Sequence, residues 1–172
     1  MLVHPGSIRK NDQEPLFSYF LNPTRVMDYI ILTLHSVLRY FVLLFMIVLI
    51  VRSFIGWRNK SAFGSLDDRL SLWIFALAHS QLLLGLVLYS VSPRVIFSGE
   101  SMKDPELRYW LVEHASMMII AITLITIGRI SVKKTTEQVL KHKKLFIYNL
   151  IALLIILAAI AQSGRGFFSL PS

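Results

Sequence analysis

Four histidines lie in or beside four separate apolar segments of this chain, one in each: His35, His79, His114 and His142. An imidazole can bind a metal, relay a proton or hydrogen-bond to a neighbouring helix. Ionisable groups are costly in hydrocarbon, so histidines placed there are candidates for one of these roles. The chain contains no cysteine, which excludes thiolate metal sites, iron–sulfur clusters and disulfides within it.

The segments that must position these histidines are 29–51, 70–91, 109–128 and 145–162. Each is long enough to cross about 30 Å of hydrocarbon as a helix, and none alternates like a barrel strand. Only 16% of the residues are charged, against roughly 25% in soluble domains. We therefore predict an all-α integral membrane protein, a four-transmembrane-helix up-down-up-down bundle over residues 27–172. Residues 1–26, with three prolines, are predicted to be an irregular N-terminal extension.

Basic residues concentrate in the first and third connections between these segments, whereas the second connection offsets its bases with acids. The positive-inside rule predicts that the first and third connections are cytoplasmic and that both termini lie outside. Membrane lipid and topology thus explain the net charge of +8, and we expect no nucleic-acid partner.

His35 follows Asp28 by seven residues and His114 follows Arg108 by six, which places both roughly 9 to 10 Å below the outer helix ends. The first and third helices run in the same direction and can face each other across a bundle. Two imidazoles on facing helices bind haem iron as a low-spin, electron-transferring site. His35 and His114 are therefore the predicted ligands of a haem b iron near the outer face.

Arg39 is one turn from His35 on the same face and is predicted to pair with a haem propionate. Glu113, Ser36 and Tyr40 are predicted to orient an imidazole or to tune the redox potential. In the alternative interpretation, Arg39 and Glu113 form an interhelical ion pair that orders the bundle without a cofactor.

His79 and His142 are candidate ligands of a second haem, toward the cytoplasm. Their predicted depths differ, because His79 is ten residues past Arg69 whereas His142 lies among lysines at the interface. His79 can instead hydrogen-bond to a neighbouring helix, contact a quinone or relay protons, and His142 can be an interfacial cation beside anionic lipid.

Zinc bound by His35, His114 and Glu113 is a further possibility, for a transporter or a catalytic metal site. The sequence contains no glycine-rich phosphate loop, no His-Glu-x-x-His motif and no hydrolase nucleophile turn.

Four strings resemble small four-helix membrane proteins of Bacteroidota that are labelled cytochrome b: HSVLRY (35–40), AHSQLLLG (78–85), VEHASMM (112–118) and KHK (141–143). The resemblance runs from Met27 to about Ala161 and implies a bacterial inner (cytoplasmic) membrane location. A fainter similarity is to one half of a haem A synthase, in which an early histidine near an arginine, a Gln-x-x-x-Gly segment and a later histidine line a haem site. Here Gln81 to Gly85 and His114 match that pattern, but the fuller eight-helix duplication and its catalytic half are missing, so the similarity implies haem binding rather than synthase activity.

The sequence thus predicts a membrane b-type cytochrome with one haem, or two, that exchanges electrons with a quinol or a partner subunit. It predicts an electron-transfer subunit rather than a stand-alone enzyme. The alternative is a non-haem structural or accessory subunit of a larger membrane complex.

Overall fold

The computed structural model describes residues 23–164, without the side chains of residues 23–25. Within this range the chain is all helical and contains no β-strand. The four long helices are α2 (Pro23–Arg58), α3 (Ser65–Val91), α5 (His114–Lys133) and α6 (Gln138–Gln162). Each is, with its flanking turns, long and apolar enough to cross a membrane, as predicted.

Helix α2 begins at Pro23, so residues 23–26 are helical rather than part of an irregular extension. Proline suits a helix start, because its missing N–H would have no partner in the first turn and its φ angle is already helical. The remainder of the predicted extension, residues 1–22, and the last eight residues, 165–172, lie outside the described residues.

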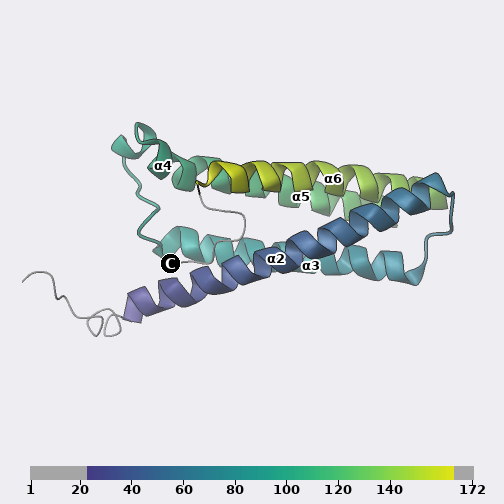
Figure 1. Ribbon diagram of the computed structural model, residues 1–172, viewed down its shortest axis with the longest axis horizontal. Helices are drawn as coiled ribbons and strands as arrows, with labels where there is room; N and C mark the ends of the chain where they lie inside the picture. The colour runs from purple at the N-terminus through teal and green to yellow at the C-terminus, as the bar shows by residue number, and fades with distance from the viewer. Residues whose placement is uncertain (1–22, 165–172) are drawn as a thin grey trace, which may run out of the picture.

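Figure 1 shows the α2–α3 connection at one end of the molecule and the α3–α4 connection at the other. Helix α2 packs mainly on α3 and α6, and α5 packs mainly on the same two helices. Helices α2 and α5 therefore occupy opposite corners of the bundle, which is the arrangement that facing histidines require.

The bundle is apolar inside and outside. Its interior contains Met46, Ile74 and Ala121, all fully buried. Large apolar side chains also cover the outside, and each long helix exposes more than half of at least one of them: Leu44, Leu83, Ile120 and Leu154.

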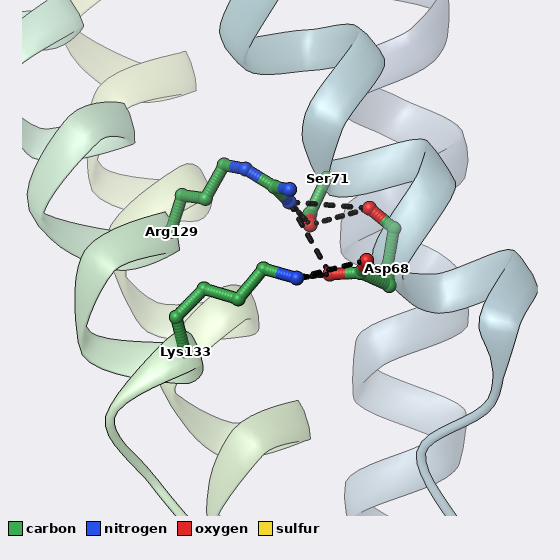
Figure 2. Close-up of polar contacts among 4 residues, drawn as sticks. All are labelled: Asp68, Ser71, Arg129 and Lys133. Atoms are coloured by element: carbon green, nitrogen blue, oxygen red, sulfur yellow. Dashed lines mark hydrogen bonds and ion pairs between the residues drawn. The ribbon is translucent and has the colours of Figure 1, made fainter.

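Charged side chains join the helices at the end of the bundle where the α2–α3 connection lies. Figure 2 shows Arg129 and Lys133 of α5 reaching across to Asp68 of α3. The Arg129 guanidinium donates to the Asp68 backbone oxygen at 3.1 Å and to the Ser71 hydroxyl, and Lys133 Nζ lies 2.8 Å from Asp68 Oδ1. These contacts fix α3 against α5 at the end opposite the cavity described below.

Helix α2 is held to α3 in the same region by a second ion pair. Arg52 Nε lies 2.5 Å from Oδ1 of Asp67, whose other oxygen accepts from the Gly64 backbone N–H at 2.8 Å. Two consecutive acidic residues of α3 therefore bind different helices: Asp67 binds α2, and Asp68 binds α5.

Candidate cofactor site between the helices

A cavity of about 540 Å³ lies between the four long helices near the α3–α4 connection. Its volume is in the range of small-molecule and cofactor sites, and its walls are mostly apolar, as such sites usually are. His35 of α2 and His114 of α5 both line it, together with Arg39. The structure thus brings together the two histidines and the arginine that the sequence singled out.

The His35 ring rests against helix α3. A Cβ atom placed on Gly85 would lie 3.4 Å from Cε1 of His35, so the glycine lets the ring pack directly on the helix backbone. One turn earlier, Gln81 Nε2 donates to the His35 backbone oxygen at 2.9 Å. The Gln-x-x-x-Gly segment therefore forms the wall behind this histidine.

Nδ1 of His35 is buried and has no hydrogen-bond partner among the described residues. Buried polar atoms are nearly always satisfied, and leaving one unpaired costs on the order of 1–3 kcal/mol. An unsatisfied imidazole in a cavity wall is what a ligand-binding site presents before its ligand is added. Both ring nitrogens of His142 are unpaired as well, so what distinguishes His35 is that it lines the cavity.

A π-helical turn, η2 (Tyr109–Glu113), leads directly into His114. It follows the short helix α4 (Pro105–Arg108), and the His114 backbone N–H donates to the Tyr109 carbonyl five residues back. Turns of this kind are rare and often occur at functional sites. Here the wider turn brings Tyr109 to the face of His114.

Aromatic side chains from this turn surround His114. The Tyr109 hydroxyl lies 3.3 Å from His114 Nδ1, and the Trp110 ring centroid lies 5.5 Å from the imidazole centroid. Sequence reasoning missed both residues. Tyr109 is five residues before His114, and residues at that spacing do not share a face on a regular α-helix, whereas Trp110 is four residues before it, at a spacing that does. The signals in the sequence were therefore an aromatic pair shortly before a histidine and the spacing of Trp110.

Two cations line the cavity, Arg39 from α2 and Arg94 from the α3–α4 connection, and its described lining contains no acidic side chain. Arg39 donates to the Tyr40 hydroxyl at 3.2 Å, whereas Arg94 forms no ion pair with any described residue. An apolar cavity with two guanidinium groups suits an apolar ligand that carries acidic groups. Arg94 was missed because the sequence does not fix the path of a connection.

Glu113 does not line this cavity. Its carboxylate instead forms an ion pair with Arg108 at 2.7 Å, and both side chains are more than a third exposed. The predicted pair with Arg39 is therefore replaced by a pair across the π-helical turn, which brings residues five apart together. Nothing in this contact supports a role for Glu113 in orienting an imidazole.

His79 and His142 do not line the cavity either. His79 Nδ1 lies 2.7 Å from the Phe75 carbonyl oxygen, one turn back in its own helix, rather than bonding to a neighbouring helix. His142 is 1% exposed, so its ring does not contact lipid headgroups as the alternative interpretation expected. Its ring packs on Gly56 and lies 5.2 Å from the Phe63 ring, because a glycine in α2 leaves room for it.

The structure does not support the alternative of a zinc site formed by His35, His114 and Glu113. Among residues 23–164, no group of three or more histidine, aspartate and glutamate side chains is placed to hold a metal ion. A haem iron needs only two axial protein ligands, since the macrocycle supplies the other four.

Comparisons of the chain with protein-family models, with curated proteins and with solved structures find no match. The functional interpretation therefore depends on the site itself.

Proposed function

We propose that this chain is a membrane b-type cytochrome that binds one haem between His35 and His114. The observation that carries the proposal is the single cavity that both histidines line from opposite corners of the bundle. Bound haem would supply a one-electron iron couple, and the electrons would be exchanged with a quinol or a partner subunit.

The residues of the cavity have complementary parts in this proposal. His35 and His114 would hold the haem iron, and the apolar walls would surround the haem and exclude water. Arg39 and Arg94 would hold the two propionates by charge-assisted hydrogen bonds. The described lining contains two guanidinium groups and no acidic side chain, a charge balance that favours an anionic ligand.

The same proposal includes the placement of the chain in a membrane. The apolar outer surface of the helices suits lipid, and the positive-inside rule applied to an up-down-up-down bundle places the cavity end and both termini outside a bacterial inner membrane. We propose one haem rather than two, because neither His79 nor His142 lines the cavity that His35 and His114 share.

Haem content of single histidine variants tests the proposal. Protein purified in mild detergent from haem-sufficient cells should contain about one haem per chain. His35→Ala or His114→Ala should remove the haem, whereas His79→Ala should retain it. Loss of about half the haem in His79→Ala would instead favour two haems. If the wild-type protein contains no haem, the cytochrome proposal fails and the alternative, a non-haem accessory subunit, is favoured.

A further inference from the structure

The geometry points to Tyr109 as a positioning residue that holds His114 in one tautomer, with the proton on Nδ1 and the lone pair on Nε2. Neutral histidine carries its single ring proton on either nitrogen, and only the other nitrogen can bind a metal. Selecting the tautomer therefore selects which ring nitrogen acts as the ligand.

The assignment follows from the two contacts of one hydroxyl group. The Tyr109 hydroxyl lies 2.6 Å from the Ala159 carbonyl oxygen and 3.3 Å from Nδ1 of His114. A carbonyl oxygen can only accept, so the phenolic proton must point to Ala159. The phenolic oxygen can then only accept from His114, which requires the proton to be on Nδ1.

Burial and packing make this arrangement specific. Tyr109 is 5% exposed and Ala159 is fully buried, so little water can compete for either contact. The Tyr109 carbonyl also accepts from the His114 backbone N–H, which sets the spacing between the two side chains. One residue thus fixes the histidine by its backbone and by its hydroxyl.

The consequence for the cofactor rests on the proposed function. A histidine that donates from Nδ1 to an oxygen presents Nε2 to iron and is a stronger ligand, which is the usual outer-shell arrangement at metal sites. Tyr109 would then raise haem affinity without touching the haem iron.

Nitrogen NMR of ligand-free protein labelled with ¹⁵N-histidine tests the tautomer without haem. At about pH 8.5, two units above the ordinary histidine pKa, the ring is neutral. With the resonances assigned through His114→Gln, we expect Nδ1 of His114 to appear protonated and Nε2 to appear unprotonated. A protonated Nε2 in the wild-type protein would overturn the inference, whatever any variant does.

Tyr109→Phe provides the second measurement. The Ala159 oxygen keeps a partner in this variant, because the Ser163 backbone N–H also donates to it at 3.1 Å. We expect both His114 nitrogens to shift toward the average of the two tautomers. Tyr89→Phe is the matched control, since Tyr89 lines the same cavity but donates to the Leu111 carbonyl at 2.9 Å. An unchanged His114 spectrum in Tyr109→Phe contradicts the inference.

Haem titration of the same proteins separates this inference from the proposed function. Haem should bind Tyr109→Phe about tenfold more weakly than wild type. If wild type shows the expected tautomer but binds no haem, the proposed function fails and the assignment to Tyr109 stands. If haem binds to the wild type but Nε2 is protonated in the ligand-free protein, the proposed function stands and the assignment to Tyr109 fails.

Discussion

At the scale of single residues, the four histidines differ in what their rings contact. His79 bonds to its own helix and His142 fills the space above a glycine. His35 and His114 face a cavity, one with an unsatisfied buried nitrogen and the other oriented by a tyrosine. Helix direction and depth, read from the sequence, could predict that His35 and His114 belong together. The contacts that orient their rings depend on packing.

Removing a cavity cation should weaken haem binding. Arg39→Gln should lower haem affinity about tenfold, because a hydrogen bond to a charged group contributes about 1.5 kcal/mol or more and 1.4 kcal/mol corresponds to a factor of ten. Arg94→Gln should have a similar effect. Titration with haem, followed by absorbance, measures both.

Arg58→Gln is the matched control for these variants, since Arg58 is exposed at the opposite end of α2 and does not line the cavity. Equal loss of affinity in the control and in Arg39→Gln would argue against a propionate contact.

At the scale of helices, close packing at one glycine joins α2 to α6. A Cβ on Gly56 would lie 2.5 to 2.7 Å from three atoms of the His142 ring, which is too close without movement. Hydropathy predicted both helices, but it could not show this contact, because both helices are apolar over most of their surface and their rotation is not encoded in a periodic pattern.

Gly56→Ala should therefore lower the free energy of unfolding in mixed micelles by about 1–2 kcal/mol. Overpacking costs about 1–3 kcal/mol, and the better helix propensity of alanine offsets up to about 1 kcal/mol of it. Gly99→Ala should be nearly neutral, since nothing lies within 4 Å of its added Cβ. Removing the ring with His142→Ala should make Gly56→Ala less costly, and strictly additive effects would rule out this contact.

The charged contacts between α3 and α5 make a second prediction for the helices. Arg129→Gln removes hydrogen bonds to Asp68 and Ser71 from a side chain that is 13% exposed, so we expect a loss of about 1–2 kcal/mol of unfolding free energy. Lys103→Gln breaks an exposed pair with Glu100 and should change stability by less than about 0.5 kcal/mol. Chemical denaturation in mixed micelles measures both, and equal effects would contradict a stabilising role for Arg129.

At the scale of the whole molecule, the sequence predicted four helices because long apolar segments dominate the hydropathy. It also predicted that His35 and His114 lie at one level on facing helices, and the structure places both in one cavity. Tyr109 and Arg94 could not be predicted, because a π-helical turn and an irregular connection bring them to the site, whereas the spacing of Trp110 from His114 is that of a regular α-helix.

Single cysteines test the proposed orientation, and the natural chain has none to interfere. Lys60 and Lys103 are both exposed, Lys60 in the α2–α3 connection and Lys103 in the α3–α4 connection. Figure 1 shows these two connections at opposite ends of the bundle. In spheroplasts, a membrane-impermeant maleimide should label Lys103→Cys, whereas Lys60→Cys should react only after the membrane is opened. The opposite labelling pattern would contradict the proposed orientation and show that the α2–α3 connection lies outside.

The most direct test of the haem site is the reduced-minus-oxidised visible spectrum of the wild-type protein. We expect a Soret band and a sharp α-band that shift and strengthen on reduction, as is typical of low-spin iron between two histidines. Folded protein from haem-sufficient cells that shows neither band would contradict the haem site.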